Sequence, residues 1–179
     1  SAEEVASITR SLRAAQPQWV ELGASGRAAC LNRFADAVMA EVAPLGRALA
    51  IDTGRSTFAH FEAIKSVELI RMWAERAGPI LDSLAGSGQS GQVPAVHYEH
   101  RLIPYEVVAV ISPWNVPLLL AMIDSLAALS AGCAVLLKPS EVTPRFVEPL
   151  QRALDTVPEL AAVLRIVTGG PETGQAMIE

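Results

Sequence analysis

Three short, mainly apolar runs in the second half of the chain constrain its fold most strongly. They occupy residues 107–111, 134–137 and 164–167. Segments of helical character at residues 116–130 and 144–156 separate them, and a third helix is expected from Gly174 onward. Short apolar strands that alternate with helices are typical of a parallel sheet with right-handed crossovers. The second half therefore predicts an α/β unit of the order βαβαβα.

Residues 1–92 carry their apolar side chains at helical spacing. The expected helices cover residues 8–22, 26–41, 44–54 and 58–84. The clearest apolar stripe contains Ala28, Leu31, Phe34, Ala35, Val38 and Met39. We expect Ser25 to cap the second helix and Pro79 to kink or end the fourth, while Gly54 and Gly132 are expected to end helices. A helical region thus precedes the α/β unit.

Residues 93–105 change to strand spacing. The alternating residues are Val96, Tyr98, His100 and Leu102, and Pro94 and Pro104 bracket them. The preceding glycine-rich segment, residues 86–91, is expected to be a turn or a flexible connector. A polar strand of this kind suits a two-stranded extension or a subunit contact better than a buried core.

Composition and charge disfavour several kinds of partner. The net charge is −5 and aromatic residues make up 5% of the chain, whereas nucleic-acid binders usually show a basic face. The most apolar stretch, residues 107–134, is interrupted by two prolines, Asn115 and Asp124, so no membrane helix fits there. The N-terminus lacks the apolar run of a secretory signal. We therefore expect a cytoplasmic protein with no nucleic-acid or membrane partner.

Metal binding is also disfavoured. Cys30 and Cys133 cannot supply a disulfide framework or a four-cysteine zinc site, and we expect both to be small packed side chains. His97 and His100 would point to opposite faces of a strand, and His60 has no partner at ligand spacing. The sequence therefore predicts no metal site.

Polar and glycine residues are concentrated directly after each predicted strand. The segments are Ser112-Pro113-Trp114-Asn115, Lys138-Pro139-Ser140-Glu141 and the glycine-rich loop at residues 168–174. In an open α/β sheet, ligands bind beyond the carboxyl ends of the strands, so these segments are expected to share one edge. Taken singly, the glycines could be turn residues and the lysine an exposed strand-end charge. The argument for a site rests on three such loops at one edge.

The residue types in these loops suit a dinucleotide. Gly169, Gly170 and Gly174 allow a backbone to approach a phosphate, and the helix that follows offers free N–H groups. Lys138 and Glu141 supply a cation and a carboxylate, and a carboxylate there can hold a ribose diol and would repel a 2′-phosphate. The amide of the asparagine in the first loop is a neutral donor, which suits a developing oxyanion.

Longer motifs resemble those of the aldehyde dehydrogenases. The matching segments are VVAVISPWNVP at residues 107–117, similar to that family's PWNxP segment, AGCAVLLKPSE at 131–141, similar to its KPSE segment, and TGGPETG at 168–174, similar to its glycine loop. Upstream, Trp19, DTGR at residues 52–55 and RLIP at 101–104 also fit. The resemblance spans nearly the whole chain. It implies a Rossmann-like NAD(P)-binding domain, of which residues 106–179 would be the first half.

The resemblance also implies an activity and assigns roles. The activity is NAD(P)-dependent oxidation of an aldehyde to a carboxylic acid, through a cysteine thiohemiacetal and a thioester. By matching position, Asn115 would be the catalytic residue that donates to the oxyanion. The cofactor-binding residues would be Ile111, Ser112, Pro113, Trp114, Lys138, Ser140, Glu141, Gly170 and Gly174. Glu141 favours NAD, with NADP as the alternative, and the strand at residues 93–105 would make contacts in a homo-oligomer, a dimer or tetramer.

The sequence departs from the family pattern at several positions. Glu106 stands where a glycine is usual, Arg55 stands where a lysine is more usual, and the loop at residues 169–174 is one residue shorter than many. The family's nucleophilic cysteine and general-base glutamate lie beyond this C-terminus, and Cys133 does not match the nucleophile. The 179-residue chain is therefore expected to be inactive alone. Two alternatives stay open: a non-catalytic nucleotide-binding or assembly module, and an acyl-CoA or acyl-phosphate reductase on the same scaffold.

Overall fold

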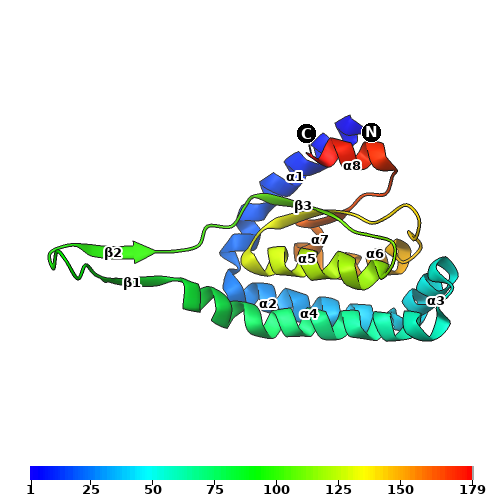
Figure 1. The fold of residues 1–179 in the computed structure, drawn as a ribbon, viewed down its shortest axis with the longest axis horizontal. Coiled ribbons are helices and arrows are strands. Elements are labelled where there is room, and N and C mark those ends of the chain that lie inside the picture. Colours follow the sequence, from blue (N-terminus) through cyan, green and yellow to red (C-terminus); the bar gives the residue numbers. More distant parts are fainter. Residues whose placement is uncertain (179) are drawn as a thin grey trace.

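The computed structural model describes residues 1–178 and is drawn as a ribbon in Figure 1. Four helices come first: α1 (Ala2–Glu21), α2 (Gly23–Ala40), α3 (Val42–Thr53) and α4 (Ser56–Leu84). Two short strands follow, β1 (Gly86–Gln89) and β2 (His97–His100). The remaining elements are β3 (Val107–Ile111), α5 (Pro117–Ala131), β4 (Ala134–Lys138), α6 (Val147–Asp155), α7 (Pro158–Ala161), β5 (Leu164–Ile166) and α8 (Pro171–Ile178). The predicted order, a helical region followed by an α/β unit, is confirmed.

Strands β3, β4 and β5 form a parallel sheet in that order, with β4 in the centre. Val107 pairs with Ala134 and Ile111 pairs with Lys138, so β3 and β4 end level with each other. Every residue of β4 is buried, because helices cover both faces of this central strand. The prediction of a parallel α/β sheet is therefore confirmed.

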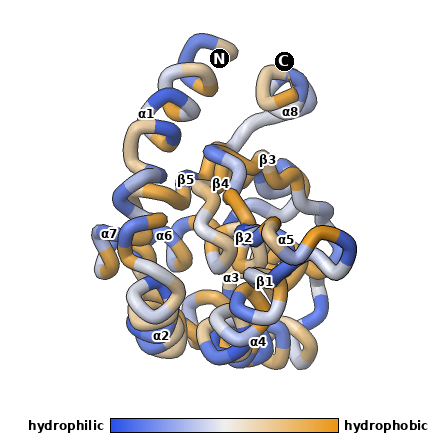
Figure 2. The backbone as a smooth tube through the Cα atoms, turned by 90° about the vertical axis from the view of Figure 1, so that its left-hand side faces the viewer, coloured by the Kyte–Doolittle hydropathy of each residue, from blue (hydrophilic) through white to orange (hydrophobic). Residues whose placement is uncertain are grey.

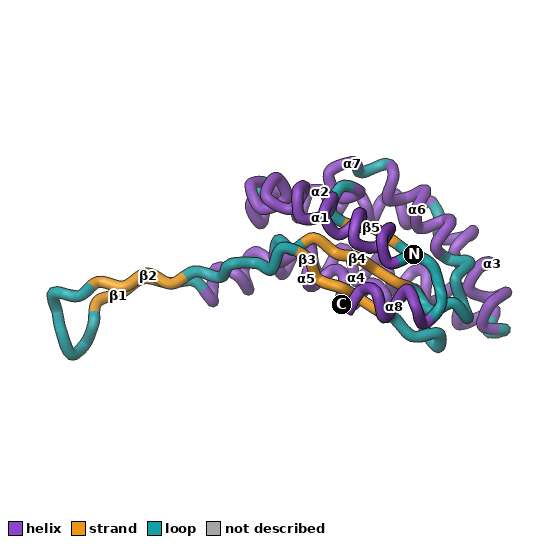
Figure 3. The backbone as a smooth tube through the Cα atoms, turned by 90° about the horizontal axis from the view of Figure 1, so that it is seen from above, coloured by secondary structure: helices purple, strands orange, loops and turns teal. Residues whose placement is uncertain are grey.

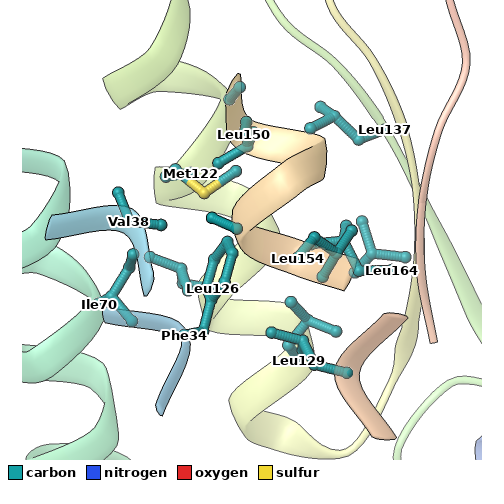
Figure 4. Close-up of a cluster of buried hydrophobic side chains, with 14 of the residues drawn as sticks. Phe34, Val38, Ile70, Met122, Leu126, Leu129, Leu137, Leu150, Leu154 and Leu164 are labelled. Atoms are coloured by element: carbon teal, nitrogen blue, oxygen red, sulfur yellow. The ribbon is translucent and has the colours of Figure 1, made fainter. Parts of the chain in front are cut away.

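Helices lie on both sides of this sheet (Figure 1). α1 and α8 lie together on one side, near the two chain ends, and α5 lies on the other side, backed by α2 and α4. Phe34, Leu126 and Leu154 belong to the buried core shown in Figure 4, and each is at most 1% exposed. In Figure 2, hydrophobic and hydrophilic residues alternate along α1, as expected of a helix with one buried face. No helix in the described part of the chain is long and apolar enough to cross a membrane.

The C-terminal end of α5 is bound by polar side chains from α1 and α2. The donor–acceptor pairs are Trp19 Nε1 to the Leu129 carbonyl (2.8 Å), Gln16 Nε2 to the Gly132 carbonyl (2.9 Å) and Arg27 Nε to the Ser130 carbonyl (3.1 Å). The last carbonyls of a helix have no partner within it, so these contacts supply the missing donors. Gly132 ends α5 with φ 101°, as predicted, because that left-handed conformation favours glycine.

β1 and β2 form an antiparallel hairpin that projects from the body of the molecule (Figures 1 and 3). Gly86 pairs with His100 and Gln89 pairs with His97, and all four residues of β2 are exposed. The expected two-stranded extension is therefore present. The expectation of only a turn or connector at residues 86–91 is wrong, because pairing with β2 makes a strand of residues that have no local strand pattern.

Several helix boundaries differ from the expectations. α2 begins at Gly23 and is not capped by Ser25, because Gly23 adopts φ 65° and turns the chain directly from α1 into α2. Pro79 does not end α4, which continues beyond it. This proline removes one N–H donor on the exposed side of the helix, where water can bind the released carbonyl. α8 begins at Pro171 rather than at Gly174, since proline suits the first turn of a helix.

Candidate functional site

The carboxyl ends of β3, β4 and β5 meet at one edge of the sheet. Ile111 pairs in register with Lys138, and the Ser112 N–H donates to the Lys138 carbonyl (3.0 Å). On the other side of β4, the Val167 N–H donates to the Leu137 carbonyl (2.8 Å). The loops that follow the three strands therefore start side by side. The prediction that the three polar loops share one edge is confirmed.

Lys138 is a buried cation with an acidic partner. Its side chain is 4% exposed, and its Nζ lies 3.0 Å from Glu141 Oε2 and 3.3 Å from the Pro139 carbonyl oxygen. The pKa of the exposed Glu141 carboxyl is lowered, first by its own backbone N–H and then by the Lys138 ammonium. Ser140 Oγ accepts from the Val142 N–H (3.2 Å) and so holds the turn between them. The alternative that Lys138 is an exposed lysine at the end of a strand is therefore wrong. The ionised carboxylate of Glu141 faces solvent at this edge.

Gly174 brings α8 against the ends of β3 and β4. It is buried, and a β-carbon added there would lie 3.7 Å from Ile111 Cδ1 and 3.8 Å from Lys138 Cδ. A longer side chain would therefore push α8 away from this edge. Because α8 begins before it, Gly174 lies inside the helix and not in the preceding loop. Gly170 lies just before α8, and its N–H donates to the exposed carboxylate of Glu172 (3.2 Å).

The loop after β3 is mostly open to solvent. Ile111, Pro113 and Trp114 are exposed, whereas Ser112 is buried. Within residues 1–178, the Ser112 Oγ has no hydrogen-bond partner. A buried hydroxyl without a partner costs about 1–3 kcal/mol, so it calls for an explanation such as an atom bound at this edge. Ser112 is therefore a candidate contact for a bound molecule.

Asn115 lies at the exposed tip of the same loop, just before α5. Its backbone carbonyl accepts a hydrogen bond from the Arg55 guanidinium, which lies 4.9 Å from the centre of the Phe58 ring. Thr143 Oγ1 donates to the neighbouring Trp114 carbonyl (3.3 Å). In the described part of the chain, no residue hydrogen bonds to the Asn115 side-chain amide. The backbone of the loop is therefore held, while the amide N–H₂ can donate to another group.

Glu62, which sequence reasoning missed, lies buried at the start of α5. It is 1% exposed, and its Oε1 accepts from the N–H groups of Leu118 (2.8 Å) and Leu119 (3.2 Å). The first N–H groups of a helix have no partner within it, so Glu62 supplies an acceptor from α4. The sequence feature that could have identified Glu62 is its position among the residues of the buried face of α4, which include Ala59 and Ser66.

The DTGR segment at residues 52–55 holds two of the three loops. The Asp52 side chain is 2% exposed, its Oδ2 accepts from the Arg145 N–H (2.9 Å), and its Oδ1 pairs with the Arg145 guanidinium. Asp52 thus binds the loop after β4, while Arg55 binds the carbonyl of Asn115 in the loop after β3. Both contacts come from the junction of α3 and α4, which precedes the two loops by more than fifty residues in the sequence.

The buried carboxyl of Glu62 should give folding a measurable pH dependence. Burial raises its pKa, against the Leu119 and Leu118 N–H groups and the charge of Arg55, which lower it. Such an acid destabilises the folded state increasingly as pH rises from the unfolded pKa, about 4.3, through the raised folded pKa. We expect the stability of Glu62→Gln relative to the parent to increase with pH over this window, as measured by urea unfolding.

The control for this pH prediction is Glu75→Gln, because Glu75 is an exposed carboxylate on the same helix. Its difference in unfolding free energy from the parent, measured at the same pH values, gives the baseline for removing one carboxylate from α4. A constant difference between Glu62→Gln and the parent across the window would contradict the prediction.

Both cysteines are free and buried, as expected of small packed residues. Burial raises the pKa of the Cys133 thiol, against a hydrogen bond with the Tyr105 backbone and the charge of Arg27. A thiol with a raised pKa is a poor nucleophile, so Cys133 is not suited to catalysis. Among residues 1–178, no group of three or more His, Cys, Asp or Glu residues is placed to hold a metal ion.

The chain matches the aldehyde dehydrogenase family over residues 1–179. A curated relative, the N-succinylglutamate 5-semialdehyde dehydrogenase of Caulobacter sp. (strain K31), is 32% identical over 184 residues, which cover 100% of this chain and 36% of that protein. The protein of the same name from Escherichia coli (strain K12 / MC4100 / BW2952) is 34% identical over 179 residues, covering 98% of this chain and 35% of that protein. The chain thus spans about a third of the length of these relatives.

A solved structure shares the fold over almost the whole chain. PutA from Anabaena variabilis, assigned to the aldehyde dehydrogenases, superposes with a TM-score of 0.93 at 41% identity, over 99% of this chain and 37% of that chain. The likeness therefore includes the helical region, the hairpin and the parallel sheet. Together with the family match, these relatives show that the chain belongs to the aldehyde dehydrogenase family and corresponds to its N-terminal portion.

Proposed function

We propose that this chain is the cofactor-binding N-terminal portion of an NAD(P)-dependent enzyme that oxidises an aldehyde to a carboxylic acid. The observation that carries the proposal is the grouping at one sheet edge of the Asn115 loop, the Lys138–Glu141 pair and the start of α8. These features supply an amide donor, a cation with an ionised carboxylate and a helix N-terminus. A dinucleotide presents ribose hydroxyls and phosphates that match them.

The residues at this edge fit an adenine dinucleotide. Glu141 can accept from ribose hydroxyls, and Lys138 can donate to them. The buried Ser112 hydroxyl is available to bind the cofactor, since no residue within 1–178 hydrogen bonds to its Oγ. We propose that the other cofactor contacts come from residues along the same edge: Ile111, Pro113, Trp114, Ser140, Gly170 and Gly174. The ionised Glu141 would repel a 2′-phosphate, so NAD is favoured over NADP.

In the proposed reaction, an aldehyde, water and NAD⁺ give a carboxylic acid, NADH and a proton. The nucleophilic cysteine, which the family resemblance places outside these residues, attacks the aldehyde carbon, and negative charge develops on the carbonyl oxygen. Asn115 donates its amide N–H to that oxygen and so stabilises the transition state. The bound coenzyme would supply the hydride acceptor, and hydrolysis of the thioester would release the acid.

An apolar groove beside the Asn115 loop suits the carbon chain of the aldehyde. It has a volume of about 580 Å³ and lies between α4 and α5. Its lining residues are Phe61, Lys65, Glu68, Leu69, Met72, Leu119 and Ile123. Leu119 lies in the first turn of α5 and follows Asn115 by four residues, so the groove begins close in sequence to the proposed oxyanion donor. The Lys65–Glu68 pair (2.6 Å) neutralises the charges at its wall, which leaves burial of apolar carbon as the main contribution to substrate binding.

The projecting hairpin supports a homo-oligomer, a dimer or tetramer. Its exposed β2 strand, together with the segment at residues 93–105, offers unpaired backbone groups to another subunit. Two free, buried cysteines are consistent with a reducing compartment, and we propose a cytoplasmic location. Cys30 and Cys133 are both buried, and we propose that the 179-residue chain is inactive without the rest of the enzyme.

The proposed function is tested by assaying the full-length enzyme for aldehyde-dependent formation of NADH. The proposal requires that the same preparation bind NAD in calorimetry without aldehyde and produce NADH only when aldehyde is present. Binding of NAD without turnover of any aldehyde would support the non-catalytic module instead. Absence of both binding and turnover would overturn the proposal.

Removing the carboxylate of Glu141 should change coenzyme preference. Glu141→Ala deletes the proposed ribose acceptor and frees the Lys138 ammonium, which can then attract a 2′-phosphate. A hydrogen bond to a charged group contributes about 1.5–3 kcal/mol, so we expect the ratio of kcat/KM for NAD to kcat/KM for NADP to fall about tenfold or more. The measurement is steady-state kinetics of the full-length enzyme with each coenzyme.

The matched control for the coenzyme experiment is Glu148→Ala. Glu148 is an exposed acid on α6 that pairs with Arg152 and not with Lys138. This variant should leave the ratio unchanged. If the ratio were equal in Glu141→Ala and the parent, Glu141 would not be the residue that selects the coenzyme.

A further inference from the structure

The N-terminus of α5 carries a contact that the proposed reaction has not used. Glu62 Oε1 accepts from the first two free N–H groups of this helix, at Leu118 (2.8 Å) and Leu119 (3.2 Å). Asn115 lies three residues before Leu118. The position of the first turn of α5 therefore sets the position of the loop that enters it. A shift of the first turn of α5 would move Asn115 with it.

The burial of Glu62 is not explained by stability alone. The residue is 1% exposed, and among residues 1–178 its Oε2 has no hydrogen-bond partner. A buried carboxylate oxygen without a partner is costly, and an apolar side chain of similar size would avoid that cost. The acceptor at Oε1 is the feature that an apolar residue could not replace. We therefore attribute the acid at this position to its role in holding the first turn of α5 in place.

The Asn115 loop is held from two sides by neighbouring parts of the same helical unit. Arg55, directly before α4, donates to the Asn115 carbonyl, while Glu62, two turns into α4, binds the first turn of α5. Both contacts act on the backbone at or after Asn115, and the hydrogen bond from Thr143 Oγ1 to the Trp114 carbonyl (3.3 Å) holds the residue before it. Together they hold the backbone from which the Asn115 side chain extends.

We propose that Glu62 is the positioning residue for Asn115 in aldehyde oxidation, an inference that rests on the proposed oxyanion role of Asn115. Its carboxylate fixes the first turn of α5 through two backbone N–H groups and thereby aims the Asn115 amide at the carbonyl oxygen of the substrate. Glu62 itself touches neither substrate nor cofactor. A displacement of about 1 Å at a catalytic group can lower the rate by about a hundredfold, so a contact of this kind affects turnover.

Two conservative variants separate geometry from charge. Glu62→Gln keeps the length of the side chain and the Oε1 acceptor but removes the charge, and its amide nitrogen replaces an oxygen that makes no hydrogen bond within residues 1–178. Glu62→Asp keeps the charge but withdraws the carboxylate by one methylene. For the full-length enzyme, we expect Glu62→Gln to keep kcat within about threefold and Glu62→Asp to lose about tenfold or more.

A double-mutant cycle tests whether Glu62 acts through Asn115. If it does, Glu62→Asp should lower kcat in the parent but should have little further effect once Asn115 is alanine. The KM for NAD should change less than about twofold in Glu62→Asp, because the Lys138–Glu141 pair is not altered. A merely structural defect would instead lower kcat by the same factor in both backgrounds. Glu75→Ala, an exposed acid on α4, is the control and should leave kcat unchanged.

The outcomes distinguish this proposal from the proposed function. If Asn115→Ala lowers kcat but Glu62→Asp does not, the positioning role is overturned and the proposed function stands. If Glu62→Gln loses activity while Glu62→Asp keeps it, charge and not geometry matters, and the positioning role is again overturned. If Asn115→Ala has no effect, the oxyanion role fails and the positioning role fails with it. Circular dichroism of each variant verifies folding, and the Gln–Asp comparison does not depend on an alanine variant.

Discussion

Asn115→Ala should lower the kcat of the full-length enzyme about a hundredfold, the usual effect of removing one oxyanion donor. The alanine keeps the backbone carbonyl that Arg55 binds, so the loop should retain its position. Only the side-chain amide is lost, and no residue in the described part of the chain hydrogen bonds to it. Because this donor acts on charge that develops during the reaction, kcat should fall much more than KM for the aldehyde rises.

Two further variants make the Asn115 experiment specific. Asn115→Asp has a similar size but offers no amide donor and adds a negative charge, so it should be at least as slow as the alanine variant. Asn32→Ala removes an exposed asparagine on α2 and should not change the rate. A kcat for Asn115→Ala within about twofold of the parent would exclude the oxyanion role, since one such donor normally contributes far more.

Phe34→Ala should destabilise the folded protein by about 3–5 kcal/mol, the usual cost of truncating a buried phenylalanine. The Phe34 ring is 0% exposed and lies among Ile70, Leu126 and Leu129 in the cluster of Figure 4. It therefore joins α2, α4 and α5 at one point. Since the core around Phe34 is close-packed, these helices cannot close the cavity fully, and the lost contacts are not recovered. The measurement is urea unfolding of the full-length enzyme.

Phe61→Ala is the control for the core substitution. Phe61 lies on α4 and is 50% exposed, so its truncation should lower stability much less than that of Phe34. Equal losses for the two variants would show that the cluster in Figure 4 is not the main packing contact between the helical region and α5.

The parallel sheet could be predicted because its signal is local. Each strand is a short apolar run, and each is followed by a helix of suitable length and by Gly or Pro at the boundary. The hairpin shows the limit of such reasoning, because Gly86-Ser87-Gly88-Gln89 has no strand pattern and becomes β1 only by pairing with β2. Pro79 shows the same limit, since the cost of a proline depends on whether solvent can reach the carbonyl it releases.

The sequence by itself determined which residue types stand at the carboxyl ends of the strands, namely Asn115, Lys138 and the glycines before α8. It also determined that they share an edge, because the strands of a parallel sheet all end on the same side. The tertiary structure alone decided that Lys138 is buried against Glu141 and that Glu62 and Arg55 hold the Asn115 loop. The Arg55 and Glu62 contacts join residues more than fifty positions apart. They depend on how the helices pack against α5, which no local pattern of apolar residues encodes.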